Sequence, residues 1–212
     1  MKKHFLPIIM LGLFVYTSPS LAQFTPSGSS SPKAVVKRFE KENFRDIKLL
    51  YIAMMNYGGG EGEFSRLVSG YAEASGKYFS REYDESAKAF KKNAQEINDS
   101  GMTIATKYKD RTVELQKEVI ELNVKIRIKN SLDNKKEDQV LEKIVHESSE
   151  SLIKANDFFQ RKKPVEAIRL YRRCKEKCIL FMDTVKEELD ESFDRDRKDN
   201  KGQVYVSKEK EN

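Results

Sequence analysis

The chain has 212 residues, of which 35% are charged, and its 40 basic and 34 acidic side chains leave a formal net charge of only +6. Charges this close to balance are typical of a solvated protein surface, and the sequence has no recognisable nucleic-acid-binding motif, so nucleic acid is excluded as an expected partner. This length fits one domain or two small ones, and the five prolines and ten glycines are few enough for long helices.

The first residues have the composition of a secretory signal. Lys2 and Lys3 precede an apolar run from Phe5 to Tyr16, and the small-x-small sequence Ser20-Leu21-Ala22 follows it. The apolar run is shorter than the roughly 20 residues that a membrane-spanning helix needs. We therefore expect a signal peptide over residues 1–22, export to the bacterial periplasm, and no membrane insertion after the signal is removed.

Residues 23–31 are rich in Ser, Gly and Pro and are expected to form a flexible leader. Ser31 and Pro32 are the residue types that favour a helix N-cap and the first helical position, and the apolar pattern after them predicts a helix to about Met55. The glycine-rich sequence from Tyr57 to Gly62 ends this helix. Neither the Gly-Lys-Ser/Thr continuation nor the preceding strand of a phosphate-binding loop is found there, so a hinge between helices is expected.

The stretch from Tyr83 to about Asn130 organises the predicted fold. Its small and apolar residues recur every three or four positions without loss of phase, at Tyr83, Ala87, Phe90, Ala94, Ile97, Gly101, Ile104, Tyr108, Thr112, Leu115, Val119, Leu122 and Ile126. This heptad-type, coiled-coil-like pattern predicts a long central helix of about 70 Å. Turn residues interrupt it at 98–101, where the helix either continues or breaks. A break would divide the α-helical domain expected over residues 32–194 into lobes of residues 32–100 and 101–194.

Two predicted helical hairpins align at a spacing of 81 residues. Tyr71, Ala74, Tyr78, Glu85, Ser86, Phe90 and Asn93 fall opposite Leu152, Ala155, Phe159, Glu166, Ala167, Tyr171 and Cys174. Small residues beside aromatic ones resemble the tetratricopeptide (TPR) hairpin, although tandem TPR arrays repeat every 34 residues or so. The sequence thus predicts an all-α, elongated helical bundle with a long central helix and two TPR-like hairpins. A bent or V-shaped pair of lobes is one arrangement open to it.

The two cysteines, Cys174 and Cys178, are four residues apart on the last long helix. They share one helix face and point the same way, which is a poor geometry for a disulfide between them. Three interpretations remain open: small apolar seam residues, an intermolecular disulfide, or half of a metal site.

The charges of the last long helix, which Pro164 opens, are unevenly distributed. The first half is basic and the second acidic, opposite to the preference of the helix macrodipole. Either this is an ordinary solvated surface, or it contacts copies of the chain head to tail or an acidic partner. The candidate protein-contact residues are Arg161, Lys162, Lys163, Arg169, Arg172, Arg173, Lys175, Lys177, Glu187, Glu188, Asp190 and Glu191. The charged residues 195–212 are expected to form a disordered tail.

Candidate catalytic groups are scarce in the sequence. After signal removal the chain has a single histidine, His146, which lies beside Glu147 on a predicted helix flank and is expected at the surface. Acidic and basic residues interleave along the helices in the manner of solvated faces. We therefore expect no catalytic, cofactor-binding or metal-binding residues and no enzymatic activity.

One resemblance to a known family rests on the middle of the chain, from Tyr57-Gly58-Gly59-Gly60-Glu61-Gly62-Glu63-Phe64 through Ser86-Ala87-Lys88-Ala89-Phe90 to Tyr108-Lys109. These residues resemble the flagellar-coiling sheath proteins of leptospiral spirochaetes, over roughly residues 33–195. The resemblance implies an exported helical protein that coats the periplasmic flagellar filament and supports its coiling and cell motility. Flagellar filament or sheath proteins and copies of the chain itself would be its partners. The alternative is a periplasmic TPR-like adaptor that binds a peptide or another envelope protein.

Overall fold

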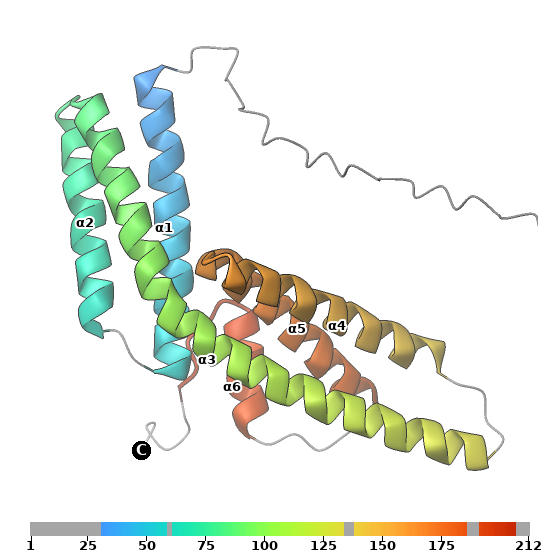
Figure 1. Ribbon diagram of the computed structural model, residues 1–212. Coiled ribbons are helices and arrows are strands. Elements are labelled where there is room, and N and C mark those ends of the chain that lie inside the picture. The colour runs from blue at the N-terminus through green and yellow to red at the C-terminus, as the bar shows by residue number, and fades with distance from the viewer. Residues whose placement is uncertain (1–30, 59–60, 134–137, 186–190, 207–212) are drawn as a thin grey trace, which may run out of the picture. The chain divides into compact units, whose positions relative to one another are not determined.

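The computed structural model describes residues 31–58, 61–133, 138–185 and 191–206, and over these ranges the protein is all-α. Six helices are present in the described ranges: α1 (Pro32–Tyr57), α2 (Glu61–Phe79), α3 (Tyr83–Leu132), α4 (Gln139–Gln160), α5 (Pro164–Val185) and α6 (Glu191–Asn200) (Figure 1). The expected signal peptide and residues 23–30 of the leader lie outside the described residues. Within the described ranges, no helix combines the length and apolar character needed to span a membrane.

The helix starts follow local sequence signals. Ser31 caps α1, since its hydroxyl accepts a hydrogen bond from the Ala34 backbone N–H at 3.3 Å, and Pro32 opens the helix as predicted. Asp138 caps α4 in the same way by accepting from the N–H groups of Val140 and Leu141. These caps satisfy backbone donors that have no partner inside a helix.

The central helix α3 is continuous over 50 residues, so the interruption left open at residues 98–101 does not break it. Gly101 is buried there for a packing reason. A Cβ atom at this position would lie 2.9 Å from Cγ of Pro164, the first residue of α5. Glycine therefore lets α5 begin directly against α3, and the cost of a glycine inside a helix is offset by this close approach.

The hairpins α2–α3 and α4–α5 have the same turn, at the predicted spacing of 81 residues. Arg81 and Lys162 both have positive φ, 65° and 55°. In each turn the N–H of this residue bonds to the carbonyl three residues back, and the N–H of the following residue to the carbonyl five residues back. The internal repeat predicted from the sequence is thus reproduced in the backbone of both turns.

The helices form two three-helix groups that share α3 (Figure 1). In the first, α1 leads to the α2–α3 hairpin; in the second, the distal half of α3 leads to the α4–α5 hairpin. Three core clusters follow one another along α3. The proximal cluster contains Val36, Ala74 and Phe90, the central cluster includes Leu50, Ile104 and Ile168, and the distal cluster includes Leu115, Ile144 and Phe181. Because the central cluster contains residues from α1, α3 and α5, it joins the two groups.

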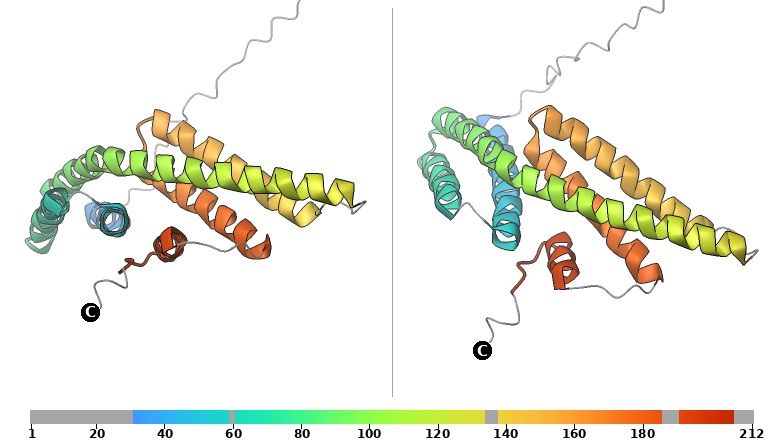
Figure 2. Two further views of the ribbon diagram at one scale, coloured as in Figure 1. Left: turned by 90° about the horizontal axis from the view of Figure 1, so that it is seen from below. Right: turned by 60° about the horizontal axis from the view of Figure 1, so that its bottom comes forward.

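The largest difference from the sequence prediction is α6. A disordered tail was expected from Arg195, but residues 191–200 form a helix that packs beside α5 and α1, and the chain is described to Val206 (Figure 2). Composition predicted disorder because the segment is highly charged. Two of those charges, on Asp196 and Asp199, are fully buried against the rest of the protein.

Candidate functional site

The structure separates the candidate contact residues of the last long helix into inward and outward groups. Lys175 is fully buried and Arg172 largely so, which corrects the expectation that they face a partner. Three others form ion pairs with neighbouring residues: Arg169 with Asp46, Lys177 with Glu147, and Arg161 with Asp157. Lys162, Lys163 and Arg173 are exposed to solvent. Of the acidic candidates, Glu187, Glu188 and Asp190 lie outside the described residues, and Glu191 begins α6.

The inward residues belong to a buried ionic cluster of Tyr57, Tyr108, Arg172, Lys175, Asp196 and Asp199. The ammonium of Lys175 lies 3.0 Å from Asp196 Oδ1 and 2.9 Å from Asp199 Oδ2. It also lies 4.5 Å from the ring centre of Tyr57 and 4.6 Å from that of Tyr108. The acidic residues that balance the basic half of α5 thus come from α6 of the same chain.

Further contacts complete the ionic cluster. Arg172 donates to both carboxylate oxygens of Asp199, at 2.7 and 3.2 Å, and the hydroxyls of Tyr57 and Tyr108 donate to Asp196 and Asp199 respectively. Paired and hydrogen-bonded charges of this kind can be buried, whereas isolated ones are very costly. The geometry therefore holds α6 onto α1, α3 and α5.

The electrostatics of the ionic cluster agree with its geometry. Burial would raise the pKa of Asp199, but the positive charges of Lys175 and Arg172 outweigh it and lower the pKa below its ordinary value. Burial, followed by the negative charge of Asp199, raises the pKa of both Tyr57 and Tyr108. These shifts favour an ionised Asp199 beside neutral Tyr57 and Tyr108. Because Lys175, Asp196 and Asp199 are 0% exposed, a substrate could not reach them while α6 is in place.

Both cysteines are free thiols buried in the distal cluster, as expected of seam residues. Cys174 and Cys178 donate to the same side-chain oxygen of Gln116, at 3.5 and 3.4 Å. A hydrogen bond with Cys174, together with burial, raises the pKa of Cys178. A thiol with a raised pKa is a poor nucleophile, which applies to Cys178, and both buried thiols are badly placed for a disulfide to another molecule. In the described ranges, no cluster of three or more His, Cys, Asp or Glu residues could hold a metal.

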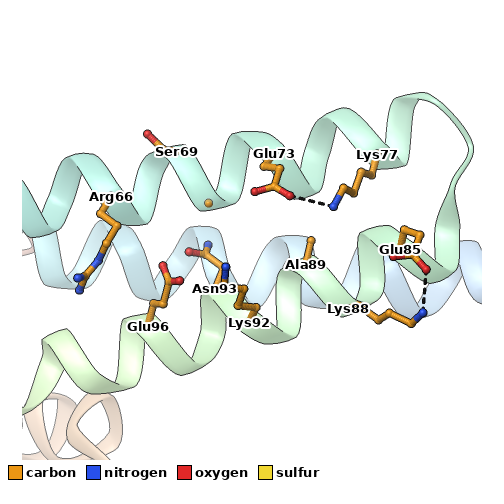
Figure 3. A pocket seen from close by; sticks show the side chains of 11 residues that line it. Arg66, Ser69, Glu73, Lys77, Glu85, Lys88, Ala89, Lys92, Asn93 and Glu96 are labelled. Carbon is orange, nitrogen blue, oxygen red and sulfur yellow. Dashed lines mark hydrogen bonds and ion pairs between the residues drawn. The ribbon is translucent and has the colours of Figure 1, made fainter.

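A polar cavity of about 400 Å³ lies between α2 and α3 (Figure 3). Four of its charged side chains pair along their own helices, Lys77 with Glu73 at 2.8 Å and Lys88 with Glu85 at 2.7 Å, while Arg66 of α2 donates to Ser100 of α3 at 3.2 Å. Asn93 lies beneath them against Gly70, where a Cβ atom would approach the Asn93 amide oxygen to 2.8 Å. The amide atoms of Asn93 are buried and have no hydrogen-bond partner among the described residues, and the charged lining also includes Lys92 and Glu96.

Two groups of exposed apolar side chains stand out among the described residues. The first, here called the α1–α2 groove, has a volume of about 250 Å³ and is lined by Phe44, Ile47, Lys48, Tyr51, Phe64, Val68 and Tyr71. Aromatic pairs cross between its two helices: the ring centres of Tyr51 and Phe64 are 4.6 Å apart, and those of Phe44 and Tyr71 are 6.0 Å apart. Phe44 is 59% exposed and Val68 is 41% exposed. Large exposed aromatic side chains grouped in this way are typical of binding surfaces.

The second surface, here called the α3 ridge, runs along the distal half of α3 and consists of Val113, Ile120, Val124 and Ile128. These side chains are 44 to 58% exposed and recur at intervals of seven, four and four residues, so they lie on one face of the helix. The opposite face of α3 contributes Leu115 and Val119 to the distal cluster. The distal half of α3 is therefore apolar on two faces, and only one of them is covered.

Comparisons with models of protein families, with curated proteins and with solved structures find no significant match to this chain.

Sequence reasoning missed the acidic half of the ionic cluster and both exposed apolar surfaces. One signal for the cluster was present, since Lys175 falls between Tyr171 and Ile179 on the apolar face of α5. A lysine at that angle needs a buried acidic partner. The α3 ridge was also visible in the sequence as a second apolar face, opposite the heptad seam.

Proposed function

We propose that this protein is a non-enzymatic structural protein of the bacterial periplasm that forms part of the sheath of the periplasmic flagellar filament. In this role it supports filament coiling and motility by binding other proteins along its surface. Support for the specific assignment comes from the sequence resemblance to leptospiral flagellar-coiling proteins and from the signal-like residues 1–22. The more general proposal, that the protein works by contact with other proteins, is supported by a feature of the structure.

The observation that carries the proposal is the uncovered α3 ridge on a 50-residue helix. Soluble monomeric proteins rarely leave an ordered row of large aliphatic side chains in water, because covering it with a partner is favourable by about 25 cal/mol per Å² of apolar area. The most unusual group of ionisable side chains, the ionic cluster, is meanwhile used to attach α6. The structural use of the ionic cluster and the exposed α3 ridge together favour a protein that works by binding other protein subunits.

The proposal is tested by isolating periplasmic flagella from the protein's own cells with detergent and probing them with an antibody. We expect the protein to sediment with the filaments. In cells that lack the filament core it should move to the soluble fraction, which controls for sedimentation of unrelated aggregates. A protein found entirely in the soluble fraction of filament-bearing cells contradicts the sheath assignment.

A second candidate, a periplasmic TPR-like adaptor, is favoured by the α1–α2 groove. An amphipathic helix of another envelope protein could bind there through its apolar face. Affinity capture from a periplasmic extract separates the two, because an adaptor should retain one envelope protein at fixed stoichiometry without filaments. The variant Phe44→Lys should lose that protein, and Ile153→Lys, which changes an exposed isoleucine on α4, should keep it.

A further inference from the structure

The two exposed apolar surfaces have complementary shapes. The α1–α2 groove is a hollow between two helices, whereas the α3 ridge is a row of side chains on one helix. A single helix laid into the groove would complete a four-helix group with α1, α2 and the proximal half of α3. We propose that the α3 ridge of one copy of this chain binds in the α1–α2 groove of a second copy.

Residue spacing on the two surfaces supports this pairing. On α1 the groove is lined by the exposed Phe44 and Tyr51 and the buried Ile47, and the exposed Met55 lies one helical turn beyond Tyr51. The exposed apolar residues are therefore spaced by seven and four positions. Val113, Ile120 and Val124 of the ridge repeat the same intervals. Intervals of three, four and seven residues are those at which side chains of two packed helices interlock. The groove volume of about 250 Å³ allows aliphatic side chains to insert between its aromatic walls.

Charge complementarity points the same way. Lys48 lines the groove, and the exposed Lys37 and Lys41 precede it on α1. Exposed carboxylates flank the ridge at Asp110, Glu114 and Glu121, with one exposed lysine, Lys117, between them. Both sets have intervals of four and seven residues, so several opposite charges can meet when the helices lie side by side. In the single chain Glu114 pairs with Arg111 at 2.8 Å and Glu121 only weakly with Lys117 at 3.8 Å. At a rim these charges set partner choice and association rate more than affinity.

This contact is heterologous, because it joins different surfaces of the two copies. Each copy keeps a free groove at one end of the pair and a free ridge at the other, so the assembly either closes into a ring or grows into a filament. The inference deepens the proposed structural role by naming one surface of self-assembly. It does not depend on which filament, if any, the assembly coats.

The test uses two variants of the purified protein that each remove one surface. The ridge variant is Ile120→Lys with Ile128→Lys, and the groove variant is Phe44→Lys with Val68→Lys. All four side chains are at least 41% exposed, so both variants should fold with an unchanged thermal melt. Every substitution is to lysine, so an altered ridge and an altered groove would carry the same charge and repel each other. An exposed-surface control changes Phe79 and Ile153, which are 76% and 69% exposed, to lysine.

Analytical ultracentrifugation over a range of concentrations gives the readout. We expect the unaltered protein and the control to associate, and each variant alone to be monomeric, with association weakened more than about a hundredfold by the desolvation of lysine. An equimolar mixture of the two variants should form a dimer and nothing larger, since the intact groove of one accepts the intact ridge of the other. A monomeric mixture, self-association of either variant, or a monomeric unaltered protein overturns the inference. Sedimentation with isolated flagella measures filament binding separately, so the sheath assignment and the ridge-in-groove contact can each fail without the other.

Discussion

At the scale of single residues, Lys175 shows how a charge can sit in the core of a small helical protein. Its ammonium is enclosed by two tyrosine rings and two carboxylates, and every polar partner comes from another part of the chain. Replacing a buried ion pair by apolar groups is often neutral, but removing only one partner leaves the others uncompensated. The ionic cluster is therefore sensitive to the loss of any single member.

The first prediction concerns Lys175→Met. Asp199 would keep its contact with Arg172, and Asp196 its 2.8 Å ion pair with Arg111, but both would lose the ammonium between them. We therefore expect the free energy of unfolding to fall by about 3 to 5 kcal/mol. Urea unfolding followed by circular dichroism measures the loss. The matched control is Lys198→Met, an exposed lysine of α6, which should change stability by less than about 0.5 kcal/mol.

The same cluster permits a double-variant check. In Lys175→Met with Asp196→Asn one of the uncompensated charges is also removed. The combined loss should therefore be clearly smaller than the sum of the two single losses, as expected for residues in direct contact. Additive losses, or a Lys175→Met variant as stable as its control, would show that the ionic cluster does not hold α6.

A second prediction at this scale is the dependence of stability on pH. The pKa of Tyr57 and of Tyr108 is raised in the folded protein above the ordinary 10.0, so their stabilising contribution is complete below pH 10 and is lost as the pH rises further. The pKa of Asp199 is lowered below its ordinary 3.8, so its contribution is present above that pH and is lost as the pH falls through the lowered value. Stability should form a plateau between these limits.

Thermal melts from pH 3 to 11 measure this profile. Above pH 10 each buried tyrosine should contribute about 1.4 kcal/mol of destabilisation per pH unit, and Tyr57→Phe should make the alkaline slope shallower by that amount. Absorbance of ionised tyrosine should then rise together with unfolding. If Tyr57 and Tyr108 ionise in the folded protein near pH 10, their burial in the ionic cluster is contradicted.

At the scale of helices, two glycines inside helices differ in whether there is room for a side chain. At Gly101 a Cβ atom would lie 2.9 Å from the rigid ring of Pro164, whereas at Gly76 in α2 a Cβ atom would have no neighbour within 4 Å. We predict that Gly101→Ala destabilises the protein by about 1 to 3 kcal/mol through overpacking. Gly76→Ala should stabilise it by up to about 1 kcal/mol, because alanine favours helix.

Chemical unfolding of the two alanine variants side by side measures this contrast. They differ in the position of one methyl group, so helix propensity alone would move both in the same direction. Stabilisation by Gly101→Ala would mean that α5 does not need a glycine at residue 101 for its close approach to α3.

The helices also show what the sequence could and could not predict. The heptad seam, the Ser31–Pro32 start and the 81-residue repeat depend on local spacing, and the structure confirms α1, α3 and both turns. Periodicity could not explain the turn-like residues at 98–101, because Gly101 packs against Pro164, which is far along the chain. The helix α6 was missed for a similar reason, since its partners on α1, α3 and α5 are not visible in its own composition.

The candidate site was predicted less well than the fold. The sequence showed the charge asymmetry of the last long helix but left open whether it was an ordinary solvated surface or a contact with another molecule. In the structure Asp196 and Asp199 neutralise Lys175 and Arg172 within the chain. A charge pattern in one dimension cannot distinguish a partner molecule from a distant segment of the same chain. Only the position of Lys175 on the apolar face of its helix indicated that its acidic partners belong to the same chain.

At the scale of the described chain from residue 31 to 206, the three core clusters argue against independently folding lobes. Leu50, Ile104 and Ile168 share the central cluster, so the two three-helix groups cannot separate without exposing it. The helix α6 adds a second connection, because Asn56 of α1 donates to Asp199 of α6 at 3.2 Å. Hydrophobic contact and buried charge thus couple the same groups of helices.

We therefore predict that unfolding is a single cooperative transition. Leu115→Ala in the distal cluster and Phe90→Ala in the proximal cluster should each cost about 2 to 5 kcal/mol, because both side chains are fully buried. If the clusters form one unit, both variants lower the midpoint of the same transition, and the calorimetric enthalpy of unfolding stays equal to the van't Hoff enthalpy. Two independent lobes would instead give a split melt in which Leu115→Ala moves one component and Phe90→Ala the other. Differential scanning calorimetry distinguishes these outcomes. It should be run at concentrations where the ridge variant is monomeric, and in that variant, so that dissociation of copies does not add a transition of its own.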